Sequence, residues 1–261
     1  MNTFFLDRLN SEPHALAFAG QSTPWPVALA DQSANPALDE ALHTHAAAAQ
    51  ALLYPVSAEL LATTGRPVDL FGFEPNPARL GAAAAASASV PGIALTQLGA
   101  LLDAAALGYN PAQAKPVAVL GHSQGVLAVH MVQAICEAGS IDAAAAKIDE
   151  ILAIATLIGV AGTRQARQLG LAARHGEATP MLSVKDITRA QVDALIERVD
   201  GARGPIAVAV TNSATHYVLS GYPEDLAAFG VEVAKEHKHQ AKLREEKVRG
   251  GRVFDPTLEY L

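Results

Sequence analysis

The sequence is poor in several features that would assign a protein to a specialised class. Its single cysteine, Cys136, permits no disulfide framework, which favours a reducing compartment. The formal net charge is -7, and no Lys/Arg-rich stretch is longer than the tail at 241–252, so a nucleic-acid-binding footprint is missing. No run approaches 18 uninterrupted apolar residues, and no basic segment followed by a long apolar run opens the chain. We therefore predict a cytoplasmic protein that binds no nucleic acid and spans no membrane.

What is present is enough apolar material for a substantial core. Half of the 261 residues are hydrophobic, which suits one large domain or two small ones. Two short apolar runs that end at glycines, 14–20 and 115–121, predict buried parallel strands. Helical spacing of apolar residues covers 35–61 and 90–107 between them. Strands that alternate with helices of this length predict an α/β sheet with right-handed crossovers.

The pattern changes near residue 178. Helices are predicted from Val126 to Gly139, with Cys136 buried, and from Asp142 to Gly170. From Pro180 onward the predicted order is strand, helix, strand, strand, helix, which is typical of a split-βαβ unit with an antiparallel sheet. We therefore predict an α/β core over 1–177, a ferredoxin-like (βαββα) subdomain over 178–242, and a truncated return to the core over 243–261.

A G-x-S-x-G pentapeptide gives the clearest chemical signal. It follows the apolar strand that ends at Gly121 and precedes an amphipathic helix, which is the context of a nucleophile elbow. Glycines at 121 and 125 fit a turn too tight for a Cβ. Ser123 would stand exposed at the helix N-terminus, where the backbone N–H of Gln124 faces an oxyanion. The alternative is a serine N-cap on a plain strand-to-helix turn.

A second polar turn follows the first predicted strand. Gly20 and Gln21 are placed to supply the other oxyanion N–H from a neighbouring strand. Without the context of Ser123, a polar turn that closes a strand explains this pair equally well.

Together these motifs resemble the acyl-CoA:acyl-carrier-protein transferases of fatty acid synthases. The resemblance rests on Gly20-Gln21 with Trp25, on VPGIALTQLGALLDAA, on GHSQG, and on PMLSV followed by NSATHYVLSG. It is strongest to the acetyltransferase domain at the N-terminus of type I synthases of actinobacteria and fungi. It implies an α/β-hydrolase-like acyltransferase core with a ferredoxin-like insert. It also implies a ping-pong reaction, in which a serine takes an acyl group from coenzyme A and hands it to a phosphopantetheine thiol.

The resemblance assigns roles to individual residues. Ser123 matches the nucleophile, and Gln21 and Gln124 match the oxyanion amides. The substrate-binding positions are Gln97, Ile158, Asn212 and His122. Malonyl-specific members place an arginine where Ile158 stands, and this arginine pairs with the free carboxylate. An apolar residue there would leave a carboxylate buried and unpaired, so the resemblance favours acetyl over malonyl.

The general base is the missing part. None of the nine histidines is convincing as a partner of Ser123. In the family the base histidine follows the small subdomain in a Phe-His-(Ser/Thr)-Pro motif, which this sequence does not contain. We therefore expect a fragment of a longer polypeptide, in which the C-terminal part of the core is missing. Without the catalytic histidine, we expect the fragment itself to be acylated slowly or not at all.

The remaining expectations concern ligands and partners. No metal-ligand spacing and no nucleotide-binding motif occurs in the sequence, so no bound cofactor is predicted. The resemblance implies coenzyme A thioesters and carrier-bound phosphopantetheine as substrates. It also implies acyl carrier protein and the other domains of a homo-oligomeric megasynthase as partners.

Three alternatives stay open at the level of sequence. The chain could transfer malonyl or palmitoyl groups instead of acetyl, because the same motifs serve all of them. It could be a serine esterase, which uses the same elbow but passes the acyl group to water. It could also be a structural, non-catalytic part of a synthase, which the missing base supports and the intact elbow opposes.

Overall fold

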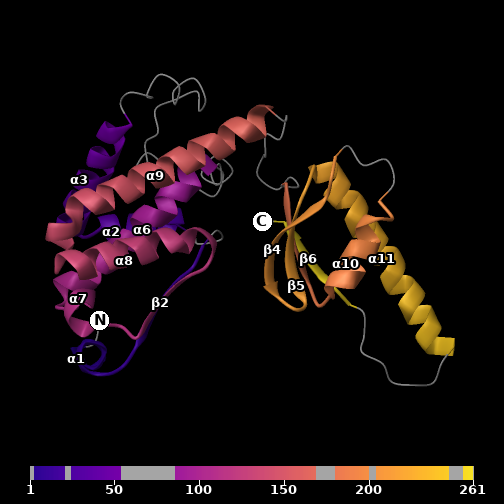
Figure 1. Ribbon diagram of the computed structural model, residues 1–261, viewed down its shortest axis with the longest axis horizontal. Helices are drawn as coiled ribbons and strands as arrows, with labels where there is room; N and C mark the ends of the chain where they lie inside the picture. The colour runs from indigo at the N-terminus through magenta and orange to yellow at the C-terminus, as the bar shows by residue number, and fades with distance from the viewer. Residues whose placement is uncertain are drawn as a thin grey trace. The chain divides into compact units, whose positions relative to one another are not determined.

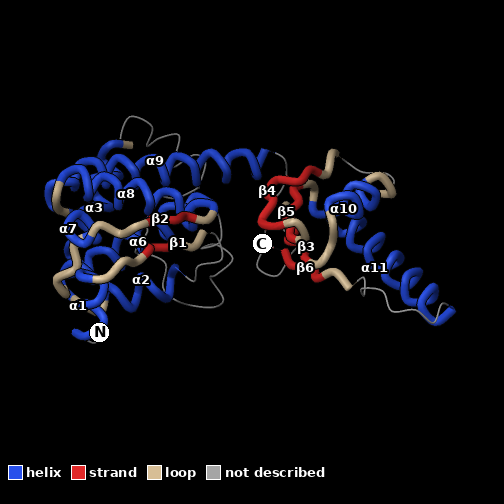
Figure 2. Tube along the Cα trace, turned by 60° about the horizontal axis from the view of Figure 1, so that its bottom comes forward, coloured by secondary structure: helices blue, strands red, loops and turns tan. Residues whose placement is uncertain are grey.

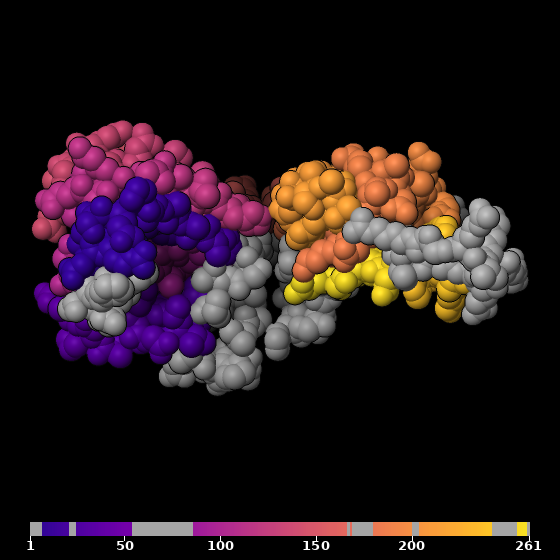
Figure 3. Space-filling model, turned by 90° about the horizontal axis from the view of Figure 1, so that it is seen from below, coloured from indigo at the N-terminus to yellow at the C-terminus, as the bar shows by residue number. Residues whose placement is uncertain are grey.

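The chain divides into two units, Met1–Leu169 and Gly170–Leu261, and each has its own hydrophobic core. The computed structural model describes residues 3–20, 25–53, 86–168, 180–199, 204–246 and 255–260. Each unit is formed by one continuous stretch of chain, as the separate colour ranges of the surface view show (Figure 3). The boundary predicted at residue 178 lies outside the described residues.

The first unit combines a helical layer with a parallel pair of strands (Figure 1). Its elements are α1 (Thr3–Ser11), β1 (Ala15–Phe18), α2 (Trp25–Ser33), α3 (Pro36–Leu52), α6 (Ala86–Ala106), α7 (Pro111–Ala114), β2 (Ala118–Gly121), the 3-10 turn η3 (Ser123–Gly125), α8 (Val126–Ala138) and α9 (Ile141–Gln168). The strands β1 and β2 pair in parallel from Ala15 opposite Ala118 to Phe18 opposite Gly121, side by side in Figure 2. The predicted pair of strands that both end at turns is thereby confirmed.

The prediction that both strands are buried is wrong. Side chains of Leu16, Phe18 and Val119 pack against the helical core of the unit. On β2, the side chain of Leu120 alternates to the other face and is 59% exposed. The continuous apolar runs predicted that both faces of the strand pair would be buried. In the described part of this unit, the hydrophobic core lies against one face of the pair only.

The helix ends follow local capping chemistry. The side chain of Asn35 accepts a hydrogen bond from the backbone N–H of Ala37 at 3.2 Å, and Pro36 occupies the first helical position of α3. Helix α8 closes on Gly139, whose φ of 90° suits glycine and whose N–H donates to the carbonyl of Ile135. The predicted stop at Gly139 is confirmed. The predicted helix over 35–61 ends at Leu52, and residues 54–61 lie outside the described residues.

Helix α6 forms the centre of the first unit. It begins at Ala86, four residues before the predicted start at Val90, and carries Pro91 inside. By length and composition it could cross a membrane, but it is mostly buried inside the unit. Gly92 lies beneath the ring of Trp25, where an added Cβ would come within 2.5 Å of the ring atom Cε3. These contacts are those of a core helix.

Two polar side chains join α3 to α9 within this core. His45 Nδ1 lies 2.6 Å from Asp149 Oδ1, and both side chains are largely buried. Because a buried polar group is costly without a partner, the pair fixes how these two helices face each other.

Cys136 lies on the exposed side of α8, so its predicted burial is wrong. The core face of this helix carries Leu127, Met131 and Ile135, spaced four residues apart. The residue after Ile135 is turned about 100° from that face, because a helix has 3.6 residues per turn. Partial desolvation and the neighbouring Glu137 raise the pKa of the thiol, which keeps it protonated and unreactive near neutral pH.

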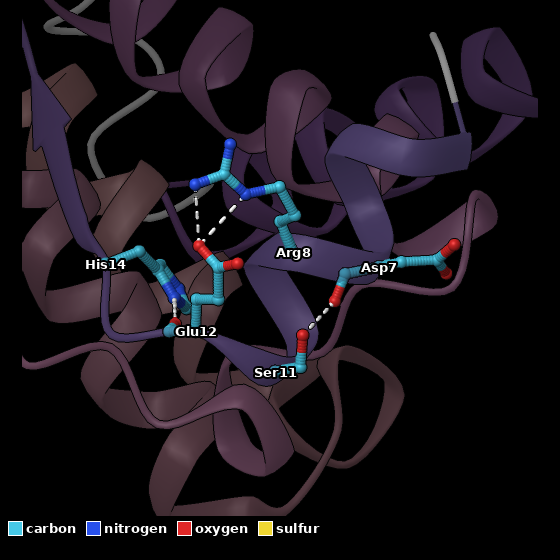
Figure 4. Close-up of polar contacts among 5 residues, drawn as sticks. All are labelled: Asp7, Arg8, Ser11, Glu12 and His14. Carbon is cyan, nitrogen blue, oxygen red and sulfur yellow. Dashed lines mark hydrogen bonds and ion pairs between the residues drawn. The ribbon is translucent and has the colours of Figure 1, made fainter.

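Local polar contacts fix the passage from α1 into β1 (Figure 4). Ser11 Oγ donates to the carbonyl of Asp7 at 2.6 Å, and Arg8 binds the carboxylate of Glu12 at 2.7 Å. His14 Nδ1 lies 3.0 Å from the carbonyl of Glu12. The hydrogen bond from Arg8 lowers the pKa of the Glu12 carboxyl, although both side chains are exposed. The helix therefore ends shortly before β1, the strand whose end contacts the elbow.

The second unit is a sheet with helices on one face (Figures 1 and 2). Its elements are β3 (Met181–Lys185), α10 (Arg189–Ile196), β4 (Ala207–Ser213), β5 (His216–Ser220), α11 (Pro223–Glu246) and β6 (Thr257–Tyr260). The strand order is β4-β5-β3-β6, and all neighbours are antiparallel. This order is that of a ferredoxin-like fold, as predicted.

The prediction that residues 243–261 return to the larger domain is wrong. Residues up to Glu246 belong to α11, and β6 pairs with β3 as the fourth strand of the small sheet. Without β6, the central strand β3 would leave one edge unpaired, and α11 is the crossover that brings the chain back to it. Leu258 on β6 packs against the core of this unit.

The core of the second unit lies between the sheet and its two helices. Leu182, Val184 and Leu219 alternate along the strands toward Phe229 on α11. Helix α10 starts with a capping box, in which the Thr188 side chain accepts from the N–H of Gln191 at 3.4 Å.

We predict that Glu236 on α11 gives this unit part of its stability at neutral pH. Its carboxylate, 19% exposed, accepts from Gln240 Nε2 at 2.8 Å and from Arg198 Nη1 at 2.9 Å. Both hydrogen bonds lower the pKa of Glu236, the bond from Gln240 more strongly. Stability from a lowered carboxyl pKa is present above the unfolded value of about 4.3 and is lost as pH falls through the folded value.

The substitution Glu236→Gln should therefore cost at most about 1 kcal/mol near pH 7, and the cost should disappear by about pH 3. Urea unfolding of both proteins at several pH values measures this difference. A difference that does not change with pH would assign the effect to packing instead.

Candidate active site

The turn between β2 and α8 carries the strained backbone of a nucleophile elbow. Ser123 has a φ of 55°, one of three positive φ values among the described non-glycine residues. Such a conformation costs about 1 kcal/mol or more for a residue with a Cβ and persists only where the surroundings impose it. Its side chain is exposed at the start of η3, and α8 follows directly. The predicted elbow is therefore present in its backbone geometry.

Three glycines allow the surrounding chain to approach the elbow. An added Cβ at Gly121 would lie 2.6 Å from the carbonyl carbon of Gly125, and one at Gly125 would collide with the carbonyl oxygen of Phe18. An added Cβ at Gly20 would lie 2.5 Å from the carbonyl oxygen of His122 and 2.7 Å from the Cβ of Ser123. The end of β1 and the elbow are thus in backbone contact, which no larger residue permits.

Backbone hydrogen bonds hold this contact in place. The N–H of His122 donates to the carbonyl of Phe18 at 3.0 Å, and the N–H of Gly125 donates to the carbonyl of His122 at 2.9 Å. The Ser123 hydroxyl thereby stands at the N-terminal end of α8, where the helix dipole favours negative charge. The backbone nitrogen of Gln124 lies 3.3 Å from the Cβ position at Gly20. The arrangement can stabilise an oxyanion that forms beside Ser123.

The predicted residues divide into those gathered here and those elsewhere. Gln97 is near the elbow on α6, and its Nε2 donates to the carbonyl of Ala19 at 2.5 Å. His122 is exposed immediately before Ser123. Ile158 is 51% exposed on α9, so the premise that a carboxylate beside it would be buried is wrong for this unit. Gln21, the other predicted oxyanion amide, lies outside the described residues.

Asn212 belongs to the second unit and is part of a polar cluster that the sequence did not reveal. Its Nδ2 lies 3.3 Å from His216 Nε2, and the same ring nitrogen lies 3.0 Å from Ser183 Oγ. With Nε2 unprotonated, the ring accepts hydrogen bonds from the Asn212 amide and the Ser183 hydroxyl. Ser183 is a buried polar residue on β3, between the apolar residues Leu182 and Val184. A lone serine within an apolar strand was the available signal.

The contacts of several histidines are accounted for by other partners. Nε2 of His14 lies 2.8 Å from the Tyr109 hydroxyl, His45 faces Asp149, and His216 faces Ser183. Within the described part of the chain, no group of three or more His, Cys, Asp or Glu is arranged to hold a metal ion. That the base for Ser123 is a histidine outside this sequence stays a prediction.

Comparison with known proteins connects the second unit to one family. Residues 180–260 match the model of a family described as the fatty acid synthase central AT domain. Over 128 residues, 44% of the chain, the sequence is 30% identical to the fatty acid synthase beta subunit hexB of Dothistroma septosporum. That match covers 7% of the fungal subunit, so the chain spans a small part of the relative's length.

Solved structures show similarity over most of the chain. The malonyl CoA-acyl carrier protein transacylase (fabD) from Coxiella burnetii superposes with a TM-score of 0.50 at 17% identity, over 86% of this chain and 58% of that one. The corresponding transacylase from Clostridium perfringens gives a TM-score of 0.49 at 16% identity, over 96% of this chain and 60% of that one. At such identity the Coxiella structure shows the fold alone, and the chain has the α/β acyltransferase fold.

Proposed function

We propose that this chain is an acyltransferase that moves an acyl group between coenzyme A and the phosphopantetheine thiol of an acyl carrier protein, through an ester on Ser123. The strained φ of 55° at Ser123, in a turn that presses against the backbone of Gly20, is the observation that carries this proposal. The match of residues 180–260 to a fatty acid synthase AT family supports fatty acid synthesis as the setting.

In the first half-reaction, Ser123 Oγ attacks the carbonyl carbon of the thioester. The Oγ–C bond forms while the hydroxyl proton passes to a general base, and the carbonyl electron pair moves onto oxygen. The backbone N–H of Gln124 and the N-terminal end of α8 stabilise that oxyanion. Collapse of the intermediate breaks the C–S bond, and the base returns its proton to the sulfur of coenzyme A. The acyl group then remains as an ester on Ser123.

The second half-reaction reverses this chemistry with another thiol. The base takes the proton of the phosphopantetheine thiol, and the sulfur attacks the carbonyl carbon of the Ser123 ester. The C–Oγ bond breaks, and Oγ recovers the proton. The resemblance described above places the base on a histidine that this sequence does not contain, and it names acyl carrier protein and the other domains of a synthase as partners. A cytoplasmic location stays a prediction.

We further propose that acetyl is preferred to malonyl. The apolar stripe on α9 formed by Ile154, Leu157 and Ile158 offers a free carboxylate no hydrogen bond. Because Ile158 is half exposed, a carboxylate beside it would keep part of its hydration. The preference should therefore be moderate, without the penalty of a fully buried charge.

The variant Ile158→Arg should raise the ratio of malonyl to acetyl ester formed on Ser123 by about tenfold, because a guanidinium can pair with the malonyl carboxylate. Ile154→Arg is the matched control, since Ile154 is 49% exposed one helical turn earlier on α9. Intact-mass measurement of acyl-enzyme in competing acetyl- and malonyl-coenzyme A gives the ratio. An equal rise in both variants would show a general charge effect and would remove the assigned role of Ile158.

Transfer to a thiol is tested against transfer to water. Labelled acetyl-coenzyme A is added with and without phosphopantetheinylated acyl carrier protein, and carrier-bound label and free acetate are measured. The proposal predicts carrier-bound label that requires Ser123, and little free acetate. Free acetate produced at the same rate without carrier would indicate an esterase, and no acylation even of a chain extended to include the expected downstream histidine would favour a structural role.

A further inference from the structure

Gln97 has an environment unlike that of a residue that lines an open cleft. It lies in the middle of α6, the central helix of the first unit, and only 8% of it is exposed. Its Nε2 donates to the backbone carbonyl of Ala19 at 2.5 Å. The acceptor belongs to the short segment that follows β1. The side chain of Gln97 therefore connects the core of the unit to the end of that strand.

The segment held by Gln97 is the one that touches the elbow. Ala19 directly precedes Gly20, whose backbone is packed against the Cβ of Ser123 and near the backbone nitrogen of Gln124. A peptide unit is planar, so a hydrogen bond to the carbonyl of Ala19 also fixes the orientation of the Gly20 nitrogen. A shift of this peptide would change the backbone that faces the Ser123 hydroxyl.

Two polar side-chain atoms, one on α6 and one in η3, have no hydrogen-bond partner. They are Gln97 Oε1, an acceptor, and Gln124 Nε2, a donor, and both atoms are buried. A buried polar atom without a partner costs about 1–3 kcal/mol, so one in a native protein calls for an explanation. Helix α6 also contacts η3, which contains Gln124. Each of these two contacting elements, α6 and η3, thus carries a buried side-chain atom that could still form a hydrogen bond.

We propose that Gln97 is a positioning residue that holds the two halves of the oxyanion-binding backbone together. Its Nε2 holds the carbonyl of Ala19 and, through the adjacent Gly20, the backbone that packs against Ser123 and Gln124. The carboxamide thus holds the end of β1 in place beside the elbow. This inference rests on the proposed acyl transfer, and it replaces the substrate contact expected for Gln97 from the family resemblance.

The variants separate this role from general support of the core. Gln97→Met keeps the length of the side chain and removes both polar atoms. Gln32→Met is the matched control: Gln32 Nε2 also donates to a backbone carbonyl, that of Thr96 at 2.9 Å, and its Oε1 is also buried without a partner. Gln32 lies on α2 and makes this bond to α6 instead of to the elbow segment. Both variants lose the same kind of bond from the same core.

Gln97→Met should lower the maximal rate of Ser123 acylation by about 10- to 100-fold, less than the loss of an oxyanion donor itself because the backbone N–H groups remain, and should change half-saturation by acetyl-coenzyme A less than about twofold. Gln32→Met should stay within about twofold of the unaltered chain in both quantities. A change confined to half-saturation in Gln97→Met would instead indicate a substrate contact. Equal loss of rate in both variants would indicate core support, and either result overturns the inference.

A pH titration adds a second test of the donor role of the Gln97 side chain. In Gln97→Glu the introduced carboxyl can donate to the carbonyl of Ala19 only when protonated, and burial beside a carbonyl oxygen raises its pKa. The ratio of the acylation rate of this variant to that of the unaltered chain should therefore rise as pH falls, by about fivefold or more between about pH 8 and about pH 5.5. A ratio that does not depend on pH contradicts the donor role.

Hydrogen exchange supplies a readout that needs no activity. If Gln97 holds the strand end, Gln97→Met should speed the exchange of the amides of His122 and Gly125, which are bonded at the elbow, whereas Gln32→Met should not. Unchanged elbow exchange together with unchanged acylation would overturn the inference and leave the proposed function intact. Faster exchange in a chain that is never acylated at Ser123 would support the inference and count against the function.

Discussion

Replacing Ser123 with glycine should abolish acylation and, at the same time, give a more stable protein than replacing it with alanine. Both variants lack the hydroxyl, so acyl-enzyme formation should fall by at least about 1,000-fold. The alanine keeps a Cβ at a φ of 55°, while glycine adopts this region without steric cost. Ser123→Gly should therefore be about 1 kcal/mol more stable than Ser123→Ala, even though glycine gains more entropy on unfolding.

The comparison requires only denaturant unfolding and intact-mass analysis of the two variants. A Ser123→Gly variant that is less stable than Ser123→Ala would mean that the backbone at residue 123 is unstrained, and the elbow would lose its physical basis. Residual acylation of either variant would place the acyl group on another residue. The strain at Ser123 and the chemistry proposed for it are thus tested by the same pair of proteins.

Replacing Gly125 with alanine should cause the next largest effect. The added methyl group would collide with the carbonyl oxygen of Phe18 and come within 2.8 Å of that of Ala19. Both atoms belong to the backbone, so the collision can be relieved only if the elbow and the end of β1 separate. We expect a loss of about 3 kcal/mol in stability. We also expect a fall of more than about 100-fold in acylation, because small displacements of reacting groups are costly.

The control for this variant is Gly230→Ala on α11. A Cβ at that position would meet Leu258 at 3.6 Å, an ordinary contact, and alanine favours a helix interior over glycine by about 1 kcal/mol. Gly230→Ala should therefore leave acylation unchanged and stability equal or higher. Normal acylation by Gly125→Ala would show that the backbone contact between β1 and the elbow is unnecessary for the chemistry.

The elements next to the elbow could be predicted from sequence because their signals are local. The strand over 115–121, the glycines of the pentapeptide and the stop at Gly139 each depend on a few neighbouring residues. The order strand, helix, strand, strand, helix in the second unit could also be predicted, because alternating apolar residues and turn residues mark each of these strands. The positive φ of Ser123 was not predicted and is seen only in the structure.

Other features depend on tertiary contacts that one sequence does not display. Burial of Leu120 was predicted because the run 115–121 is apolar, but only one face of β2 packs against the described core. The strand Thr257–Tyr260 is too short to show a period, and its place beside β3 is decided by the open edge there. The clusters of His45 with Asp149 and of His216 with Ser183 join residues more than 30 positions apart. Residue spacing along the sequence therefore cannot predict these contacts.

The central claim, that Ser123 carries the acyl group, is tested most directly by locating that group. The 261-residue chain is incubated with acetyl-, malonyl- or palmitoyl-coenzyme A, and its intact mass and digested peptides are measured beside those of Ser123→Ala. We predict an acetyl group mapped to Ser123 and absent from the variant, with less malonyl and palmitoyl, and more of it when the chain is extended to include the expected downstream histidine. An adduct on another residue, or an equal adduct on Ser123→Ala, would contradict the claim.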